Sequence, residues 1–352
     1  MKIVVDAMGG DHAPEVVVAG AVNEARQRGA QIILVGQEPA VRAELAKHGD
    51  SRSRLSRLPI EIVHASEVVE MAEHTLAVKA KRDSSLMVGM RLVKEGKADA
   101  FASAGNSGAV MAAALFSLGR ISGIERPAIG SIYPAAPDRC LIVDIGANAD
   151  CKPEYLVQFA IMGHAYARVI FGLDNPAVGI VSNGEEADKG SMLVRETYPL
   201  LKASGLNFIG NVEGKDLGRG TANVVVTDGL TGNVIVKLTE GVVSFLAKTL
   251  KRELTRGFRN KLGLILLAPG LILALPGLAL LYPSVRSLMQ RVDWREIGGA
   301  PLLGVNGVVV IGHGRSDAKA IGSMIRMAEK SARQNLVGAI QAELAKRRND
   351  QG

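Results

Sequence analysis

Short apolar runs alternate with helical patterns along most of this chain, and a turn rich in glycine, asparagine or aspartate follows nearly every apolar run. The stretch Ala100–Gly119 shows the pattern. Ala100–Ala102 is typical of a buried strand, Gly105–Gly108 of a turn and Ala109–Leu118 of a helix. Regular alternation of this kind predicts an α/β fold with three layers, α/β/α, in which helices cover both faces of a mostly parallel sheet.

The same reading gives the other elements. The further expected strands are Ile3–Val5, Gln31–Val35, Ile60–His64, Ala128–Tyr133, Cys140–Ile145, Ala177–Val181, Phe208–Gly210, Val224–Thr227 and Val308–Ile311. The further expected helices are Val16–Arg28, Pro39–His48, Ser84–Glu95, Leu156–Ile170 and a long final helix over Asp317–Lys346. A chain of 352 residues can bury a large core in such a fold.

The polar turns predict where a ligand binds. In a parallel α/β sheet the ligand lies beyond the carboxyl ends of the strands. A helix that starts after such a turn offers unpaired N–H groups and a positive dipole end, which suit phosphate or another anion. Any single polar loop could equally be a tight turn that binds no ligand. Because polar loops follow so many strands, we predict that they form one shared polar cleft at one edge of the sheet. The predicted substrate- and phosphate-binding residues are Gly105, Asn106, Ser107, Asn148, Asp228, Asn233, Asn306 and His313.

Composition narrows the class of protein. Aromatic residues make up only 4% of the chain, which disfavours a nucleic-acid binder that relies on aromatic stacking. The formal charge of +7 suits an acidic partner or anionic lipid. Two cysteines, Cys140 and Cys151, form no disulfide framework, so a reducing cytoplasm is expected. Cys151 fits a small buried thiol better than a nucleophile.

Several familiar signatures are absent from the sequence. There is no G-x-G-x-x-G dinucleotide fingerprint, no Walker A loop and no G-x-S-x-G nucleophile elbow. No two histidines stand at metal-ligand spacing. The N-terminal apolar region is too short for a signal peptide. We therefore predict neither a metal nor a nucleotide cofactor.

Gly241–Ile297 departs from the alternating pattern and predicts a protruding amphipathic helical hairpin with an apolar tip over 262–282. The tip is long enough to span a bilayer, but Pro269, Pro276 and Pro283 interrupt it. We therefore expect the tip to enter one leaflet. A buried or dimer-forming hairpin is the alternative. The predicted membrane contacts are Leu266, Leu267, Leu271 and Leu273.

Ten motifs in this order resemble those of the bacterial phosphate acyltransferases, over nearly the whole chain. They are D-A-M-G-G-D-H-A-P (Asp6–Pro14), K-R-D-S-S (Lys81–Ser85), S-A-G-N-S-G-A (Ser103–Ala109), I-E-R-P-A (Ile124–Ala128), D-I-G-A-N-A-D (Asp144–Asp150), V-Q-F-A-I-M-G (Val157–Gly163), N-G-E-E-A-D-K-G (Asn183–Gly190), T-D-G-L-T-G-N (Thr227–Asn233), G-A-P-L-L-G-V-N-G (Gly299–Gly307) and H-G (His313-Gly314). Two features depart from the family pattern. Glu73-His74-Thr75 replaces an expected proline-containing turn, and the apolar tip is longer than usual.

The resemblance implies a fold like that of phosphotransacetylases and isopropylmalate dehydrogenases, one acyltransferase domain over 1–352, and a homodimer. The implied reaction is attack of inorganic phosphate on an acyl carrier protein thioester, which gives acyl-phosphate for phospholipid synthesis without a cofactor. The acidic carrier protein would suit the basic hairpin and the net positive charge. The enzyme would be cytoplasmic and peripherally attached to the inner face of the cytoplasmic membrane, where a glycerol-3-phosphate acyltransferase would use its product.

Lys189 is a cation within a polar strand-end loop, beside Asn183 and Glu185. We predict that these three residues are catalytic and that Lys189 pairs with phosphate or the developing oxyanion. A solvated surface lysine is the alternative. Two other functions remain open: a metal- and NAD-dependent decarboxylating dehydrogenase on a related fold, and a non-enzymatic membrane scaffold.

Overall fold

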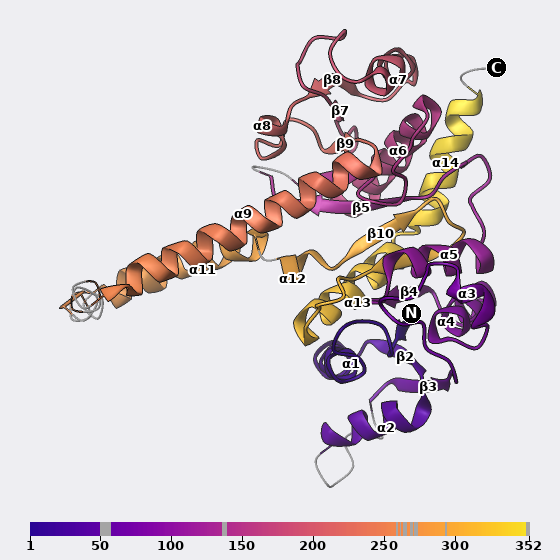
Figure 1. The fold of residues 1–352 in the computed structure, drawn as a ribbon, viewed down its shortest axis with the longest axis vertical. Helices are drawn as coiled ribbons and strands as arrows, with labels where there is room; N and C mark the ends of the chain where they lie inside the picture. Colours follow the sequence, from indigo (N-terminus) through magenta and orange to yellow (C-terminus); the bar gives the residue numbers. More distant parts are fainter. Residues whose placement is uncertain are drawn as a thin grey trace. The chain divides into compact units, whose positions relative to one another are not determined.

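The computed structural model describes the chain except for residues 50–57, 136–138, 258–259, 261, 263–265, 268–269, 271–273, 293 and 350–352. The chain divides into two compact units (Figure 1). The first combines Met1–Gly232 with Trp294–Gly352, and the second is Asn233–Asp293. The second unit covers most of the segment 241–297, for which the sequence predicted a hairpin.

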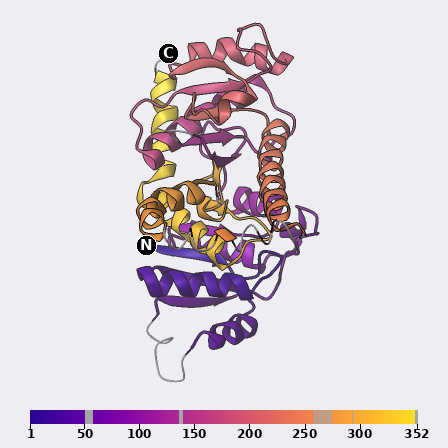
Figure 2. The ribbon, with the colours of Figure 1, turned by 90° about the vertical axis from the view of Figure 1, so that its left-hand side faces the viewer.

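The first unit is built on one sheet, in which the described residues form eleven strands in the order β3-β2-β1-β4-β11-β10-β5-β6-β9-β7-β8. Figure 2 shows the strands following one another along the length of this unit. Their bounds are β1 Lys2–Asp6, β2 Gln31–Gly36, β3 Ile60–His64, β4 Ala100–Ser103, β5 Ala128–Tyr133, β6 Cys140–Val143, β7 Val178–Val181, β8 Phe208–Val212, β9 Val224–Val226, β10 Ala300–Leu303 and β11 Val308–Ile311.

Strand direction divides this sheet into two sets. β1, β2, β3, β4 and β11 run parallel to one another, and so do β6, β7, β8 and β9. The β11–β10, β10–β5 and β5–β6 pairings are all antiparallel. Three reversals leave the two sets pointing in opposite directions, so their carboxyl ends lie at opposite edges. The sheet is mostly parallel, as predicted, but the prediction that the polar loops share one edge is wrong.

Side chains on β1 alternate between two cores, because neighbouring residues of a strand face opposite sides. Val4 belongs to a buried cluster with Met90 and Ala113, whereas Val5 belongs to another cluster with Val18 and Ile325. Helices α4 and α5 therefore cover one face, and α1 and α13 cover the other. This arrangement confirms the predicted three-layer fold. The helices of this unit are α1 Glu15–Arg28, α2 Glu38–Lys47, α3 Ala77–Ala80, α4 Ser85–Lys94, α5 Ser107–Ser117, α6 Pro153–Tyr166 with a π-helical turn Ala167–Phe171, α7 Met192–Ala203, α8 Gly214–Leu217, α12 Trp294–Ile297, α13 Ala318–Arg333 and α14 Leu336–Asn349.

Two helix predictions need correction here. The expected single helix over Asp317–Lys346 is two helices, α13 and α14, which are separated at Asn335, where φ is +49°. No glycine or proline marks that break in the sequence. The sequence reading also did not include α7, which begins after Ser191 and continues through Pro199.

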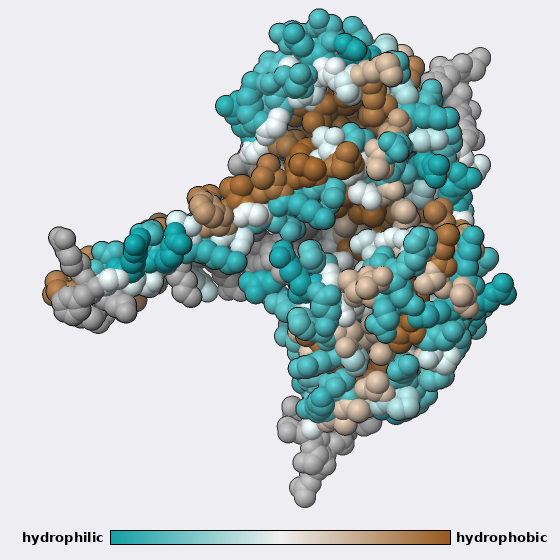
Figure 3. Space-filling model, viewed as in Figure 1, coloured by the Kyte–Doolittle hydropathy of each residue, from teal (hydrophilic) through white to brown (hydrophobic). Residues whose placement is uncertain are grey.

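The second unit contains most of α9 (Gly229–Thr255) and α11 (Leu275–Val292). The α9 helix begins twelve residues before Gly241, where the amphipathic helix was predicted to start. Exposed apolar residues recur at every fourth position of α9, and Figure 3 shows apolar surface along its first half. This row is Leu230, Val234, Leu238, Val242, Leu246, Leu250 and Leu254. By length and composition alone, α9 could cross a membrane. Pro283 lies inside α11, so the helix continues through this residue.

Candidate active site

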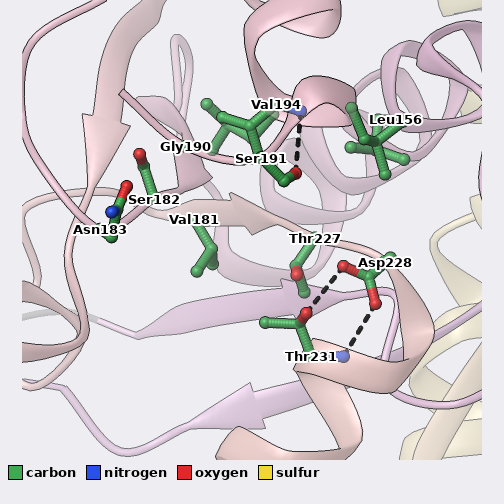
Figure 4. Close-up of a pocket in the computed structure, with 12 residues that line it drawn as sticks. Leu156, Val181, Ser182, Asn183, Gly190, Ser191, Val194, Thr227, Asp228 and Thr231 are labelled. Atoms are coloured by element: carbon green, nitrogen blue, oxygen red, sulfur yellow. Dashed lines mark hydrogen bonds between the residues drawn. The ribbon is translucent and has the colours of Figure 1, made fainter. Parts of the chain in front are cut away.

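A cavity of about 440 Å³ lies in the first unit, at the carboxyl ends of β7 and β9 (Figure 4). The apolar lining residues come from α6, α7 and β7, and the polar ones follow β7 and β9 or stand at the starts of α7 and α9. The lining residues are Leu156, Ile180, Val181, Ser182, Asn183, Gly190, Ser191, Leu193, Val194, Thr227, Asp228 and Thr231. A pocket with one apolar wall and a few convergent polar groups is typical of a small-molecule site.

Two helices begin at this cavity, and each carries a capping side chain. Ser191 Oγ accepts a hydrogen bond from Val194 N at 3.3 Å, at the start of α7. Asp228 accepts from Thr231 N at 2.8 Å and from Thr231 Oγ1 at 2.7 Å, at the start of α9 (Figure 4). The remaining N–H groups of each first turn and the two helix dipoles favour an anion beside these ends. The Asp228 carboxylate opposes part of that potential.

Ser182 lines the cavity and carries a buried hydroxyl group. Its Oγ is buried and has no hydrogen-bond partner among the described residues. Gly190 has a φ of +101°, and a Cβ there would lie 3.1 Å from this oxygen and 2.6 Å from Val194 Cγ1. A side chain at Gly190 would therefore crowd the hydroxyl. Leaving a buried hydroxyl unpaired costs about 1–3 kcal/mol, which makes Ser182 a candidate contact for substrate.

The three predicted catalytic residues lie on one loop, Asn183–Gly190, but in different settings. Asn183 lines the cavity. Lys189 is exposed, does not line the cavity, and its ammonium group makes no hydrogen bond or ion pair with any described residue. Glu185 is exposed and its Oε1 lies 3.2 Å from Lys215 Nζ. Asn183 therefore lies in the candidate site, and Lys189 lies on the same loop without an ion pair to a described residue. Glu185 pairs with Lys215 instead. Their catalytic roles remain predictions.

One group of three carboxylates in the described chain has the spacing of metal ligands, Glu185, Glu213 and Asp216. Lys215 pairs with both Glu185 and Glu213, and Arg219 Nη1 lies 3.2 Å from Asp216 Oδ1. These two cations already offset the negative charge of the cluster.

Asn148 holds the neighbouring loop in shape. Its Nδ2 donates to Pro127 O at 2.8 Å and to Asp144 Oδ2 at 2.9 Å, and its carbonyl accepts from Gly229 N at 2.7 Å. The Asp144 carboxylate is fully buried and also accepts four backbone N–H groups. Asn148 therefore joins the loop after β6 to the start of α9, beside Asp228.

At the opposite edge, the loop after β4 is held by its own hydrogen bonds. Asn106 Oδ1 caps α5 by accepting from Ala109 N at 3.1 Å, and Nδ2 donates to Met71 O at 2.9 Å and Glu73 O at 3.3 Å. Gly105 is buried and donates to Ser103 Oγ at 3.0 Å. Ser107 is exposed at the first position of α5. Asn106 thus pins the loop that contains Glu73-His74-Thr75.

Asp6 lies next to the loop after β4. It is 2% exposed, and its Oδ2 accepts from Ser103 Oγ at 2.7 Å. Burial raises the pKa of its carboxyl, against the lowering effect of hydrogen bonds from Ser85, Ser103 and backbone N–H groups.

The remaining predicted residues are dispersed. His313 is exposed after β11, at the same edge as Asn106, and its Nδ1 accepts from Arg315 N at 3.3 Å. Asn306 donates to Arg120 O at 2.7 Å and is exposed. Asn233 is the first residue of the second unit. Leu266 and Leu267 are 70% and 60% exposed, while Leu271 and Leu273 lie outside the described residues.

The cysteines do not suit nucleophilic catalysis. Burial raises the pKa of the Cys151 thiol to about 11, and the carboxylates of Asp144 and Asp228 act in the same direction. Burial also raises the pKa of Cys140 to about 12. Both thiols are therefore protonated at neutral pH, although Cys151 is only half-buried and not fully buried as the sequence suggested.

Sequence reasoning did not identify several residues of the cavity, among them Ser182, Ser191, Thr227 and Thr231. Ser191 carries the one signal that was available, a serine directly before an apolar helical stretch, which is typical of an N-cap. Ser182 carries no such signal, because what singles it out is a buried hydroxyl group without a hydrogen-bond partner among the described residues.

Known proteins resemble this chain over nearly its full length. A family model described as "Fatty acid synthesis protein" matches residues 1–338. A phosphate acyltransferase of Herpetosiphon aurantiacus is 47% identical, covering 97% of this chain and 96% of that protein. A phosphate acyltransferase of Pelotomaculum thermopropionicum is 45% identical, covering 98% and 95% respectively.

Solved structures match the fold at low identity. A phosphotransacetylase from Streptococcus pyogenes gives a TM-score of 0.62 at 19% identity and covers 94% of both chains. A 4-hydroxythreonine-4-phosphate dehydrogenase from Klebsiella pneumoniae gives 0.56 at 12% identity, covering 94% of this chain and 99% of that one. These likenesses confirm the predicted phosphotransacetylase-like architecture.

The family model and the relatives define an enzyme of the acyltransferase class. Within that class, the chain belongs to the phosphate acyltransferase family, as its motifs predicted.

Proposed function

We propose that this enzyme transfers an acyl group from an acyl carrier protein thioester to inorganic phosphate. A phosphate oxygen attacks the thioester carbon, and the carbonyl oxygen becomes an oxyanion. Collapse of the tetrahedral intermediate breaks the C–S bond. The products are an acyl phosphate and a free thiol, and the proton lost by hydrogen phosphate passes to the thiolate sulfur.

The cavity at the starts of α7 and α9 carries this proposal. Both the attacking phosphate and the developing oxyanion are anions, and two helix N-termini meet at this cavity beside the unpaired Ser182 hydroxyl. Asn183 would donate to a phosphate oxygen from the cavity wall, and Lys189 would supply the positive charge from the adjoining loop. The apolar wall, with Leu156, would contact the start of the acyl chain.

Direct attack by phosphate fits the cysteine chemistry. An acyl-enzyme pathway through a cysteine would need a thiolate, whereas burial raises the pKa of Cys151 to about 11. Holding phosphate and thioester side by side supplies the rate enhancement through orientation and oxyanion stabilisation, without a covalent intermediate.

The proposed setting is the cytoplasmic face of the membrane, with a homodimeric enzyme attached peripherally. Exposed leucines of the second unit, including Leu266 and Leu267, support insertion into one leaflet, and the net charge of +7 supports attraction to anionic lipid. Although α9 is long enough to cross a bilayer, Lys237 and Glu240 within it disfavour a full span. The acyl phosphate would then pass to a membrane glycerol-3-phosphate acyltransferase.

The reaction is tested by incubating the purified enzyme with an acyl carrier protein thioester and labelled inorganic phosphate. We expect the label to appear in an acyl phosphate that hydroxylamine converts to a hydroxamate, with one thiol released per acyl group. Thiol release without labelled acyl phosphate would contradict the proposal. Reduction of NAD in the presence of a divalent metal and a hydroxy acid would favour the dehydrogenase alternative.

Membrane attachment has a separate test with a matched control. Leu266→Asp/Leu267→Asp should release the enzyme from anionic liposomes while leaving acyl transfer in solution intact. The control Leu200→Asp/Ile209→Asp replaces two exposed apolar residues of the first unit and should still bind. Equal binding by both variants would contradict the role of the apolar tip.

A further inference from the structure

A second concave surface lies on the first unit, outside the candidate active site. It encloses about 850 Å³ and lies between α3, α4 and the last turn of α5. None of its lining residues contributes to the cavity at α7, and none belongs to the second unit. We call this surface the α4 groove. Its size exceeds that of the candidate active site.

The α4 groove is strongly positive. Lys79, Arg82, Arg91 and Lys94 line it and are all exposed. None of these four cations forms an ion pair within 4.0 Å of a carboxylate in the described chain. The groove contains one carboxylate, Glu95, which pairs with Lys97 outside the groove at 2.7 Å. Four exposed cations in one concavity create a positive potential that favours an acidic partner.

Apolar groups lie between these charges. Phe116 is 48% exposed, and the ammonium group of Lys79 lies 4.8 Å from the centre of its ring. Met87 lines the groove as well. An exposed aromatic ring beside a cation, in a groove that also contains methionine and further cations, is typical of a protein interface, where apolar anchors make the central contact and charges select the partner.

The spacing of these residues matches a helical partner. Met87, Arg91 and Lys94 occupy positions i, i+4 and i+7 of α4, and therefore form a stripe about 10 Å long, or two helical turns. A partner helix with carboxylates at the same intervals could pair with this stripe along its length. A bilayer surface is flat and would not fill a concavity, and a nucleic acid strand would find a single aromatic ring for stacking.

We propose that the α4 groove docks an acidic helix of the carrier protein that bears the acyl thioester. This inference rests on the proposed function, because it identifies the surface that recognises the macromolecular part of the donor. It places carrier recognition on the first unit, whereas the sequence alone suggested the basic hairpin. The acyl thioester reaches the active site separately, so carrier recognition and chemistry use different residues.

Charge reversal on α4 tests the groove. The variant Arg91→Glu/Lys94→Glu changes two exposed side chains, and the control Arg42→Glu/Lys47→Glu on α2 changes the net charge by the same amount. We expect the groove variant to raise KM for the carrier-bound acyl thioester by about tenfold or more, with kcat unchanged. KM for an acyl-pantetheine thioester of the same chain length should not change. The control should match the wild type on both substrates.

Salt and oligomeric state complete the test. The kcat/KM of the wild type on the carrier substrate should fall with rising salt, and that of the groove variant should be nearly independent of salt. An unchanged KM for carrier substrate would overturn the inference. An equal rise in KM for the pantetheine thioester would overturn it as well. So would a variant whose sole defect is a change of oligomeric state, a loss of liposome binding or a loss of nucleic-acid binding. If the wild type transfers no acyl group from carrier protein to phosphate, the proposed function itself fails.

Discussion

The loops after β4 and β7 share a sequence pattern, a buried strand followed by a polar turn and a helix, yet they use their polar groups differently. After β4, Asn106 makes three hydrogen bonds to the protein. After β7, Ser182 Oγ and Asn183 make none with the described residues and face a cavity. The first loop is braced by residues 71–73, which are distant in sequence. Tertiary partners therefore decide whether such a turn holds the chain or binds a ligand.

The largest expected effect comes from the loop after β7. Lys189→Ala should lower kcat/KM by about a hundredfold or more, because an unpaired cation next to developing negative charge stabilises the transition state. Steady-state kinetics with carrier substrate and phosphate measure this loss. Lys202→Ala, at the other end of α7, is the control. A Lys189→Ala enzyme within twofold of the wild type would mean that Lys189 is a solvated surface lysine.

Asn106→Ala should lower the stability of the protein and leave its kcat/KM almost unchanged. It removes an N-cap and two hydrogen bonds to the loop at 71–73, so the free energy of unfolding should fall by about 2 kcal/mol. Urea denaturation measures the loss. The kcat/KM per folded molecule should stay near that of the wild type. A large rise in KM for phosphate with normal stability would show instead that this loop binds substrate, and the contrast between the loops would disappear.

Ser182→Ala should raise KM for phosphate by about tenfold without lowering stability, because its buried hydroxyl makes no hydrogen bond within the part of the chain that the structure describes. Ser204→Ala is a matched control, since Ser204 Oγ donates to Leu201 O at 2.6 Å and accepts from Leu206 N at 3.3 Å. The control should lose stability and keep its KM. If Ser182→Ala behaves like the control, the hydroxyl has a structural role.

The smallest effect concerns pH. Burial raises the pKa of Asp6 above its unfolded value near 3.8, so the folded protein takes up a proton at a higher pH than the unfolded chain does. Relative to Asp6→Asn, the wild type should gain stability as pH falls through the folded pKa. The gain should be complete below 3.8 and lost as pH rises again. Denaturation of both proteins between pH 7 and 4 measures it, and a constant difference would contradict the raised pKa.

The fold could be predicted from the sequence because strands and helices alternate with clear periodicity. The direction of each strand could not, because the pairing of β10 with β5 joins segments that lie far apart in the sequence. Two of the three reversals are pairs of consecutive strands, β5–β6 and β10–β11, and the third forms because Ala300–Ile311 inserts into the middle of the sheet. As a result, loops of similar sequence were assigned to one edge, although they occupy two.

Only part of the candidate site could be predicted, because the role of its residues depends on contacts between segments that are distant in the sequence. The residues Asp228–Asn233 were interpreted as a turn because two glycines follow an aspartate, but Gly229 begins α9. A Cβ at Gly229 would lie 2.6 Å from Asn148 O, and one at Gly232 would overlap Asp144 O. Glycine is required here so that a helix can approach the loop after β6 closely. Asn183 and Asp228 were correctly placed in a cleft, whereas Ser182 was not predicted.

The position of β11 has a consequence for how the protein is made. This strand lies between β4 and β10, and α13 packs on the same apolar face as α1. The ribosome therefore releases β1, β2, β3 and β4 long before the segments that complete their sheet and cover it. Until then β4 has an unpaired edge and Ile3 and Val5 lack their cover from α13. Completion of this half of the sheet therefore waits until the segment 308–333 has been synthesised.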